Sequence, residues 1–530
     1  MIKESFYKRL QNQAKSELAA KADKYRVVVQ LGHCSTSLGA KEVVESFDKY
    51  LTSDSYLVVA GCDGACFNGP TVSVRSPDGS IVSLDNMDAS IAVRIATLIE
   101  GNVSPLKFKD ANNVFIDGQT RLVLQTCGEI DAVNLSEYIE TKGYYGLFKA
   151  VSLSPDKVID RVKNSGLRGR GGAYFPTALK WKGARKAKGV NKYIVVNSEE
   201  GEPGVFKDRH LMEGVPHKII EGALIAAYAV GANNIFFYIN AEANLSYERM
   251  NLAIKEMTSG GILKDGIMGS KWPVKIELRR GAGGYVCGEE TTLINTMEGY
   301  RREPRLRPPF PTESGYLDSP TIINNAETLA NLPHIFSSPI SDFTAIGVEN
   351  QSGTKLISLS GAVRRTGLAE VPFGTTLKYL VNHIGGGLPE SKSVKAIGIG
   401  GPSSGLLPPS LIDTKISPGA LNEAGVILGS GGVIVLDDTI TIIDFIRHLA
   451  AYNSDESCGK CTPCREGTPK LVELIDKFIS QKATSHDVNE IESLAMIIKD
   501  SSLCGLGQAA GTPVFSLIRF FYDQLLIKDN

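Results

Sequence analysis

The segment 456–464 reads ESCGKCTPC, which places Cys458, Cys461 and Cys464 at C-x2-C-x2-C spacing. A further cysteine, Cys504, follows far downstream in the segment SLCG (502–505). Three thiolates at this spacing can face one corner of a small cage that a distant fourth thiolate closes, which is how a [4Fe–4S] cluster is held. Because such a cluster transfers single electrons, the segment predicts a C-terminal domain built around a redox centre.

Two other interpretations of the four cysteines stay open at this point. A zinc ion with four cysteine ligands usually takes two separated C-x2-C pairs, so this spacing favours iron–sulfur over zinc. A set of reduced structural cysteines would need no particular spacing. Around the cysteines, apolar residues recur with helical periodicity, which predicts a helical bundle over residues 440–530. These residues are Leu471, Leu474, Ile475 and Phe478, then Ile491, Leu494, Ile497 and Ile498.

Length and composition describe a multidomain protein. A chain of 530 residues is too long for one core, so we expect roughly three or four domains. Lys plus Arg number 57 and Asp plus Glu 58, and this balance gives no electrostatic reason to expect a nucleic-acid partner. No run of about 18 apolar residues occurs, so we expect no direct membrane insertion. The N-terminus lacks a signal-peptide pattern and the cysteines cluster with metal-type spacing, which predicts a cytoplasmic protein.

Changes in pattern divide the chain into six parts. In order they are a polar helix (1–24), a small α/β module (25–105), a connector (106–149), a domain of alternating strands and helices (150–336), a glycine-studded α+β domain (337–439) and the helical bundle (440–530). Within 150–336 we expect a strand at Tyr193–Val196, a helix at Pro216–Val230 and a strand at Ile235–Ile239. This alternation predicts a parallel sheet covered by helices.

A glycine-rich loop, SGLRGRGGAYFPT, occupies residues 165–177. Its glycines let backbone N–H groups approach a phosphate or an aromatic ring closely. The loop follows a helix and carries Tyr174 at the third glycine position, so it fails the dinucleotide fingerprint, which needs a preceding strand. A flexible surface turn is the alternative. Positive charge for a phosphate would come from Arg168, Arg170 and Lys180.

An acidic loop, NSEEGEPG (197–204), follows the strand that ends at Val196. Binding sites in open α/β sheets lie at the carboxyl ends of strands. Three buried carboxylates there cannot all be relaxed, and they would accept hydrogen bonds from an isoalloxazine ring, a ribose or a nicotinamide carboxamide. A solvated acidic turn is the alternative. A third loop, GAGGYVCGEE (281–290), opens a predicted helix and would bring glycine N–H groups near a phosphate.

Together with PPFP (308–311), NNAET (324–328) and GSGG (429–432), these segments resemble the NADH-binding flavoprotein subunit of respiratory complex I. They equally resemble its soluble relatives, the diaphorase subunits of NAD(P)-linked hydrogenases and formate dehydrogenases. The resemblance implies an α/β multidomain fold with a Rossmann-like FMN- and NAD(H)-binding domain, a β-grasp-like domain and a helical bundle with a [4Fe–4S] cluster. It also implies hydride transfer from NAD(P)H to FMN, and single-electron transfer through the cluster to other iron–sulfur subunits of a multi-subunit redox complex.

The resemblance assigns roles to individual residues. The implied FMN contacts are Gly169, Arg170, Gly171, Gly172, Lys180, Asn197, Glu199, Asn324 and Asn325. The positions near the flavin and the nicotinamide are Glu202, Tyr285, Gly288, Glu289 and Glu290, with Glu202 and Tyr285 in catalytic roles. Phe175 and Phe310 match aromatic residues that sandwich the adenine. The implied cluster ligands are Cys458, Cys461, Cys464 and Cys504.

The sequence departs from the family pattern at several positions of the nucleotide site. Tyr174 and Ala178 replace glycines of the flavin loop, and Glu199 replaces an aspartate that contacts FMN. Gly183 stands where a second adenine-stacking aromatic is usual, a loss on the order of 1 kcal/mol of affinity. We expect Tyr174 to narrow the pocket, shift the NADH/NADPH preference or block hydride donors. The alternative function is therefore an electron-relay or scaffold subunit with an impaired nucleotide site.

Residues 25–105 resemble the thioredoxin-like [2Fe–2S] module that is fused to the soluble diaphorase subunits. They supply three of the expected cysteines, namely Cys34, Cys62 and Cys66. The fourth is missing, because residues 29–31 occupy its place, and a [2Fe–2S] cluster normally needs four ligands. Three explanations stay open: His33 substitutes for the missing cysteine, a partner or solvent ligand completes the site, or the cluster is lost and the module serves for docking.

Overall fold

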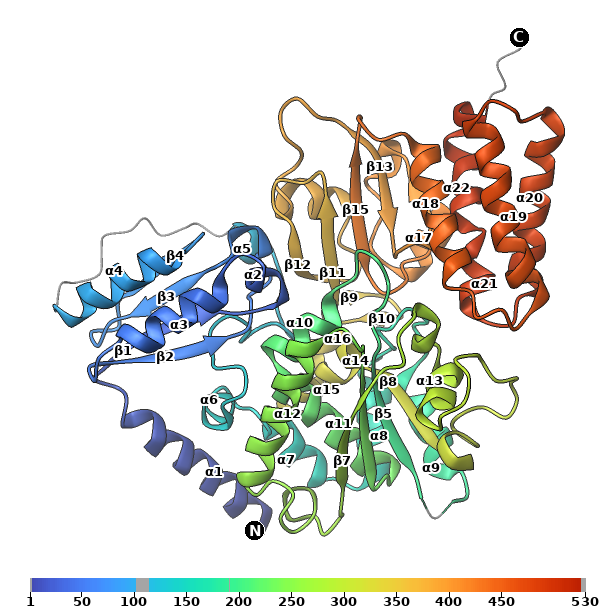
Figure 1. Ribbon diagram of the computed structural model, residues 1–530. Helices are drawn as coiled ribbons and strands as arrows, with labels where there is room; N and C mark the ends of the chain where they lie inside the picture. Colours follow the sequence, from blue (N-terminus) through green and yellow to red (C-terminus); the bar gives the residue numbers. More distant parts are fainter. Residues whose placement is uncertain (1, 102–113, 190, 526–530) are drawn as a thin grey trace.

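The computed structural model describes residues 2–101, 114–189 and 191–525. The predicted boundary at 105/106, the first part of the connector and the last residues of the bundle lie outside this range. The described chain forms an N-terminal module, a central domain with a parallel sheet, a strand-rich domain and a helical bundle (Figure 1). The predicted α/β multidomain class is confirmed.

The N-terminal module follows the helix α1 (Ile2–Ala19). Its sheet has the order β2 (Ser55–Ala60), β1 (Tyr25–Gln30), β3 (Val72–Arg75) and β4 (Ile81–Leu84). β1 and β2 are parallel and are joined through α2 (His33–Thr36) and α3 (Ala40–Tyr50), whereas β3 is antiparallel to both β1 and β4. α3 packs with α4 (Ala89–Glu100) over a core that includes Phe47 and Ile95. This is the thioredoxin-like arrangement that the family resemblance implies.

The central domain has a fully parallel sheet in the order β7 (Lys275–Arg280), β6 (Asn234–Ile239), β5 (Tyr193–Ser198) and β8 (Thr321–Asn325). The chain runs outward from β5 to β6 and β7 and then returns to the other side of β5 as β8. This order makes a topological switch point between β5 and β8, where ligands bind in open α/β sheets. The polar ends of these two strands, Asn197 and Asn324, therefore lie at the expected site.

Helices surround this sheet and connect it to the rest of the chain. They are α6 (Leu135–Glu140), α7 (Tyr145–Val151), α8 (Pro155–Asn164), α9 (Thr177–Lys186), α10 (Lys207–Gly214), α12 (Asn244–Ser259), α13 (Glu290–Met297), α14 (Ala326–Ala330), α15 (Leu332–Ser337) and α16 (Ile340–Thr344). Most of them lie in the stretches where the sequence alternates between strand and helix patterns. The short helix α5 (Val114–Asp117) packs instead against residues 379–384 of the strand-rich domain.

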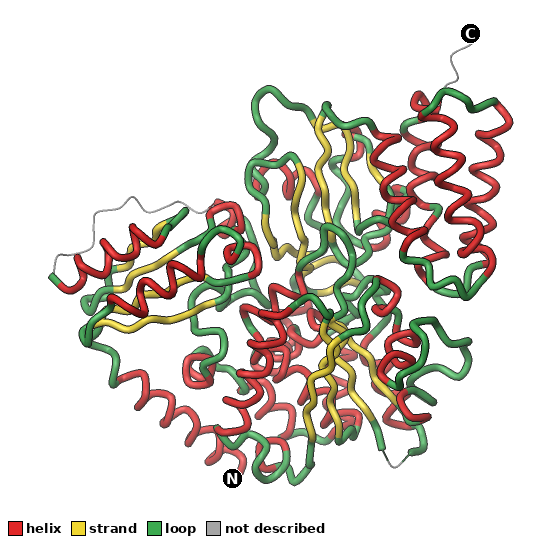
Figure 2. The backbone as a smooth tube through the Cα atoms, in the orientation of Figure 1, coloured by secondary structure: helices red, strands yellow, loops and turns green. Residues whose placement is uncertain are grey.

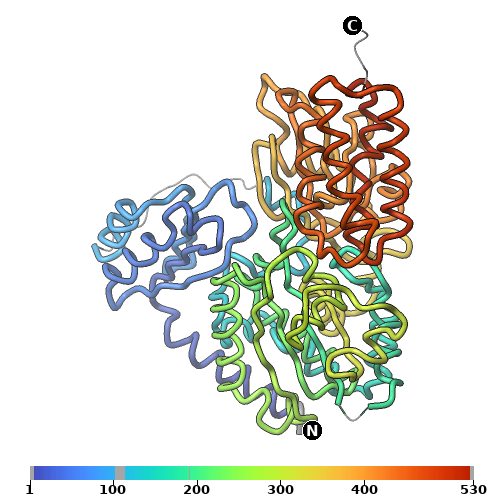
Figure 3. The backbone as a smooth tube through the Cα atoms, turned by 45° about the vertical axis from the view of Figure 1, so that its right-hand side comes forward, coloured from blue at the N-terminus to red at the C-terminus, as the bar shows by residue number. Residues whose placement is uncertain are grey.

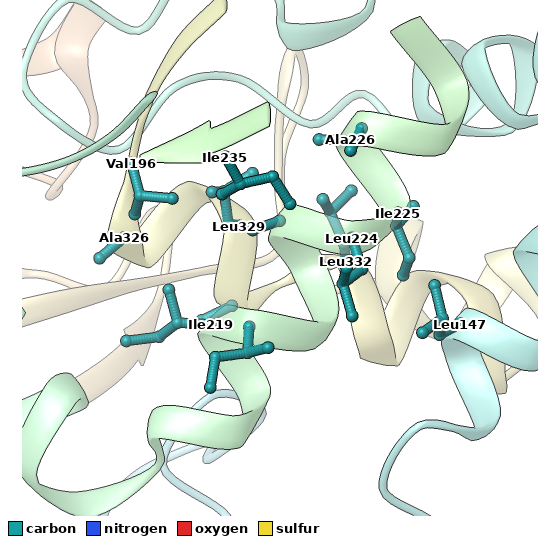
Figure 4. Close-up of a cluster of buried hydrophobic side chains, with 14 of the residues drawn as sticks. Leu147, Val196, Ile219, Leu224, Ile225, Ala226, Ile235, Ala326, Leu329 and Leu332 are labelled. Carbon is teal, nitrogen blue, oxygen red and sulfur yellow. The ribbon is translucent and has the colours of Figure 1, made fainter. Parts of the chain in front are cut away.

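The core of the central domain is organised by α11 (Pro216–Val230), which is buried at every position except Tyr228. A helix that is buried on all sides belongs in the middle of a large domain. Figure 4 shows Ile219 and Leu224 of this helix among side chains of β5, β6 and α14. Gly222 allows the close approach to α14, since a Cβ atom there would lie 2.1 Å from the carbonyl oxygen of Leu329.

The strand-rich domain has a mixed sheet in the order β12 (Gly367–Pro372), β11 (Thr354–Gly361), β15 (Gly432–Asp437), β13 (Val394–Ile399) and β14 (Leu406–Leu407). β11 and β15 are parallel, and the other pairs are antiparallel. A short hairpin of β9 (Gly347–Val348) and β10 (Gln351–Ser352) precedes it. A π-helix (Tyr379–Ile384) and α17 (Pro418–Ala424) accompany the sheet.

The C-terminal bundle consists of α18 (Ile442–Asp455), α19 (Thr462–Ile479), α20 (Ser485–Ser501), α21 (Gly505–Ala510) and α22 (Thr512–Phe520), as Figure 2 shows. Its core contains the predicted periodic residues Leu471, Leu474, Ile491 and Ile498. Figure 3 shows the bundle standing beside the strand-rich domain and above the central domain. Among the residues described, no helix is long and apolar enough to cross a membrane.

Candidate functional site

A cavity of about 930 Å³ opens where the central domain, the strand-rich domain and the bundle meet. Its volume lies near the top of the range of roughly 300–1,000 Å³ for cofactor sites. The predicted glycine-rich loop, acidic loop and third loop all contribute to its wall, together with Asn324 and Asn325 at the end of β8. The strand-rich domain adds residues 403–404, 427 and 429–430, and the bundle adds residues 504–506 and 508–509.

The glycine-rich loop lies directly on this cavity. Gly169, Gly171 and Gly172 line it, and Gly171 is pressed so closely against Asn325 that an added Cβ atom would lie 3.1 Å from the Asn325 Cβ. No hydrogen bond within the described residues engages the amides of Gly171 and Gly172. The loop thus offers free N–H groups at a place where a side chain on Gly171 would crowd Asn325, and this arrangement suits a phosphate or a flat ring.

Arg170 differs from the expected phosphate contact. Its buried guanidinium donates to the carbonyl oxygens of Thr354 (3.1 Å), Ser352 (2.7 Å) and Arg168 (2.9 Å). It also lies 4.6 Å from the centre of the Phe373 ring. The side chain does not line the cavity but anchors the loop to the strand-rich domain. Lys180 does line the cavity, where its Nζ donates to Glu290 (2.7 Å) and to the Ile323 carbonyl oxygen (2.9 Å).

The three carboxylates of the acidic loop all line the cavity. Burial raises the pKa of Glu199, Glu200 and Glu202 to about 7 in each case. Both oxygens of Glu200 are satisfied, because they accept hydrogen bonds from the amides of Asp208 and Arg209. Glu199 accepts a hydrogen bond from Asn240 on one oxygen, and its buried Oε2 has no partner among the described residues. Perturbed, incompletely paired carboxylates of this kind mark ligand sites.

Glu202 and Tyr285 lie together in the cavity wall, as their predicted roles require. The two side chains hydrogen-bond to each other, and the charge of Glu202 together with burial raises the pKa of Tyr285. The Tyr285 amide donates to Glu456 (2.7 Å), and its ring contacts Tyr452 edge-on at 5.9 Å. Residues of the bundle therefore fix the position of Tyr285.

The remaining predicted residues of the third loop have separate functions. Gly288 accepts a hydrogen bond from the Asn197 side chain (2.8 Å). Glu289 caps α13 by accepting from the amides of Thr291 and Thr292, so its carboxylate supports the helix although it lines the cavity. Glu290 forms ion pairs with Lys180 (2.7 Å) and Arg307 (3.2 Å), and these cations lower its pKa despite burial.

Asn324 and Asn325 are held rigidly at the switch point. Asn324 accepts a hydrogen bond from the indole of the buried Trp181 (2.9 Å). Asn325 caps α14 through the amide of Glu327 and donates to Asp208 (2.6 Å). Asp208 also lines the cavity. It is absent from the predicted set, although it lies only four residues beyond the end of the acidic loop (197–204). Gln508 and Ala509 line the cavity as well, and their sequence carries no signal of a site.

Aromatic residues mark the rim. Phe175 and Phe310 line the cavity with 55% and 50% of their surface exposed, which leaves their rings free to stack on a base. Tyr174 adopts a positive φ of 51°, and its buried ring packs against Phe373 of the strand-rich domain. Its hydroxyl donates to the Gly429 carbonyl oxygen (2.8 Å). Tyr174 is therefore a tethered part of the wall.

Cys458, Cys461, Cys464 and Cys504 surround one small void together with Val286 and Leu506. Cys461 is the N-cap of α19 and Cys504 that of α21, so the N-terminal ends of both helices lie at the thiols, as suits an anionic cluster. The donor set and its enclosure fit a [4Fe–4S] cluster. Val286, Cys504 and Leu506 also line the large cavity, so the two sites share a wall.

The N-terminal cysteines form a different set from the one expected of a [2Fe–2S] module. Cys62 and Cys66 have a ligand atom of His210, a residue of α10, within 4.8 Å of both thiols. Cys34 hydrogen-bonds to Cys66. The ring of His33, the substitute considered above, instead contacts Glu213 at 3.0 Å. Four cysteines for a [2Fe–2S] cluster are not present in the described module, so the residues do not fit that cluster.

Comparison with known proteins identifies the family. Residues 162–334 match the Nuo51 FMN-binding domain, and residues 444–527 match the NADH-ubiquinone oxidoreductase-F iron-sulfur binding region. The HndC subunit of the NADP-reducing hydrogenase of Solidesulfovibrio fructosivorans is 43% identical over 77% of this chain and 83% of its own length. The second F-type subunit of the NADH-quinone oxidoreductase of Rhizobium meliloti (strain 1021) is 42% identical over 73% of this chain and 92% of its own length.

A solved structure supports the same assignment. A chain of an NAD+-reducing [NiFe]-hydrogenase in the H2-reduced state superimposes with a TM-score of 0.68 at 27% identity, covering 98% of this chain and 90% of its own. The predicted resemblance and the predicted FMN and [4Fe–4S] cofactors are thereby confirmed. The chain belongs to the family of FMN-binding, iron–sulfur proteins that includes the F-type subunits of NADH-quinone oxidoreductases and HndC of the NADP-reducing hydrogenase.

Proposed function

We propose that this chain is the electron-input component of a multi-subunit redox complex, which takes hydride from NADH or NADPH in the large cavity. Single electrons then leave through the four-cysteine site of the bundle to an iron–sulfur partner. The observation that carries the proposal is the wall that the two sites share, made of Val286, Cys504 and Leu506. FMN, when bound, would supply the chemistry that links a donor of two electrons, the nucleotide, to an acceptor of single electrons, the cluster.

Different residues of the cavity would bind different parts of FMN and of the nucleotide. The free amides of Gly171 and Gly172, with Lys180 nearby, would hold the FMN phosphate. The unpaired oxygen of Glu199 and the carboxylate of Glu202 would accept hydrogen bonds from ring or ribose donors. In this proposal the exposed rings of Phe175 and Phe310 stack on the adenine.

Tyr285 and the bundle would keep water away from the reacting centre. The ring of Tyr285 is wedged between Glu202 and Tyr452, and Tyr452 donates in turn to the Gly201 carbonyl oxygen (2.7 Å). This contact joins the bundle to the acidic loop across the cavity. A water-excluded site strengthens the electrostatic interactions inside it.

In this proposal each domain predicted from the sequence has one function. Residues 150–336 bind flavin and nucleotide, residues 337–439 close the cavity, and residues 440–530 hold the cluster. We also propose a cytoplasmic location. All nine cysteines lie in the described part of the chain and none forms a disulfide, which agrees with a reducing compartment.

Cofactor content and steady-state activity test the proposal together. Purified anaerobically, the protein should contain FMN and the iron of one [4Fe–4S] cluster, and it should reduce an artificial dye with NADH or with NADPH. Glu202→Gln should retain FMN but reduce the dye more slowly. Bound FMN without activity toward either nucleotide would overturn the proposal, and would favour the alternative of an electron-relay or scaffold subunit.

A further inference from the structure

Two thiols and one imidazole converge where the N-terminal module meets the central domain, and a third thiol lies beside them. Cys62 and Cys66 belong to the loop that follows β2, and His210 belongs to α10 of the other domain. The ligand atoms of these three residues all lie within 4.8 Å of one another. Cys34 lies next to this group, because its thiol hydrogen-bonds to Cys66, although its sulfur is not one of the three atoms that lie within 4.8 Å of one another. The set thus combines residues from two domains.

His210 has one ring nitrogen that the rest of the protein leaves unused. The residue is 3% exposed, and its Nε2 is buried without a hydrogen-bond partner among the described residues. A hydrogen bond with the backbone of Cys62 orients the ring. A buried polar atom left unpaired costs roughly 1–3 kcal/mol, so native proteins rarely keep one without a reason. A metal ion bound beside Cys62 and Cys66 would supply the missing partner.

The spacing of the donors suits one metal ion better than a two-iron cluster. In a [2Fe–2S] cluster the four ligands are divided between two irons. Here three ligand atoms gather around one point, and only Cys34 would remain for a second iron. A single ion with three thiolates and one imidazole is a standard arrangement for structural zinc. We propose that Cys34, Cys62, Cys66 and His210 form a tetrahedral zinc site that fastens the N-terminal module to the flavin-binding domain.

The surroundings of the site support bound thiolates. The amide of Gly64 donates to the Cys62 sulfur (3.4 Å), and such contacts orient metal-bound thiolates. Three thiolates and a Zn²⁺ ion carry one net negative charge. Two guanidiniums stand close by to balance it. Arg121 donates to the carbonyl oxygen of Asp63 (2.6 Å), and Arg249 donates to the carbonyl oxygen of Ala60 (3.4 Å). These two acceptors are one and two residues from Cys62 in the chain.

The two domains are packed closely enough for a shared metal site. A Cβ atom at Gly61 would lie 2.2 Å from the Cα of Gly214, so the loop and the end of α10 are in backbone contact. Glu213 strengthens this junction by accepting from both the amide (2.8 Å) and the ring (3.0 Å) of His33. Asp208 belongs to α10, like His210, and lines the flavin cavity. A zinc ion bound to His210 would therefore also help to fix the position of this part of the cavity wall.

Metal analysis and X-ray absorption of the full-length protein test the proposal. We expect about one zinc ion per chain, with three sulfur ligands at about 2.3 Å and one nitrogen ligand at about 2.0–2.1 Å. His210→Ala should lose its zinc to a chelator that leaves the wild-type zinc bound, with FMN and cluster iron unchanged. His210→Cys should retain zinc through a fourth thiolate. His33→Asn is the matched control and should keep both the zinc and its nitrogen ligand.

Three outcomes would overturn the proposal. The first is wild-type protein without zinc that instead holds iron beyond one [4Fe–4S] cluster and shows a second reduced-cluster signal in electron paramagnetic resonance. The second is a His210→Ala variant that keeps zinc with unchanged ligands. The third is a wild-type zinc spectrum without a nitrogen ligand, which decides the matter even if the variants fail to fold.

Discussion

Glu202→Gln should stabilise the flavin-free protein at alkaline pH although it weakens the proposed function. Glu202 is 8% exposed and lies in the cavity wall beside Tyr285. Burial is the main reason that its pKa is raised from 4.5 to about 7, and the nearby Lys207 and Ser430 only partly offset this effect. A glutamine of nearly the same shape removes the charge while keeping an oxygen for the hydrogen bonds.

The sign and size of the effect follow from proton linkage. Below pH 4.5 the carboxyl is protonated in the folded and unfolded states, so it contributes no difference. Between pH 4.5 and about 7 the folded state keeps the proton that the unfolded state has released, so the free energy of unfolding falls as pH rises. At about 1.4 kcal/mol per pH unit, the full loss is about 3 kcal/mol above pH 7. The variant should avoid this loss.

Urea unfolding at pH 5 and pH 8 measures the difference. Tryptophan fluorescence follows unfolding, and of the two tryptophans Trp181 reports on the site, because this buried indole donates to Asn324 in the cavity wall. The matched control is Glu423→Gln, which removes an exposed carboxylate from α17 and should be neutral at both pH values. The account of Glu202 is refuted if Glu202→Gln gains no stability over the wild type between pH 5 and pH 8.

Three further changes have defined outcomes. Glu327→Gln breaks a fully buried ion pair with Lys355 (2.6 Å) and should cost about 3–5 kcal/mol of unfolding free energy in urea, most of which the double replacement by methionine should restore; no loss in the single variant would contradict this. Cys504→Ser should remove the iron–sulfur absorption while FMN content stays constant, and retention of a full cluster would exclude Cys504 as a ligand. Tyr174→Phe should lose about 1 kcal/mol with the hydrogen bond to Gly429 and leave nucleotide affinity unchanged in a fluorescence titration, whereas tighter binding would show that the tyrosine obstructs the pocket.

The elements that the sequence predicts well are those with strong local patterns. The helix predicted at 216–230 matches the bounds of α11, and β5 and β6 extend at most two residues beyond the predicted strands. The carboxyl end of β5 also carries the predicted acidic loop. The alternative of a solvated acidic turn does not hold, because burial raises the pKa of all three carboxylates.

Features that depend on distant segments could not be predicted in the same way. The guanidinium of Arg170 is directed by carbonyl groups 182 and 184 residues further along the chain, and no local pattern reveals them. His210 reaches the N-terminal cysteines only because α10 packs on the loop that follows β2. A single histidine within a helix has no metal-type spacing. The sequence therefore suggested His33, which lies next to Cys34 in the N-terminal module.

Anaerobic titration with NADH and then NADPH tests the central claim most directly, with the flavin followed by visible absorption and the cluster by low-temperature electron paramagnetic resonance. The shared wall of the two sites predicts that one nucleotide bleaches the flavin and that a reduced [4Fe–4S] signal appears in the same titration. Cys461→Ser should retain the flavin bleaching and lose the cluster signal. If only dithionite reduces either centre in the wild type, the cavity does not accept hydride and the account is contradicted.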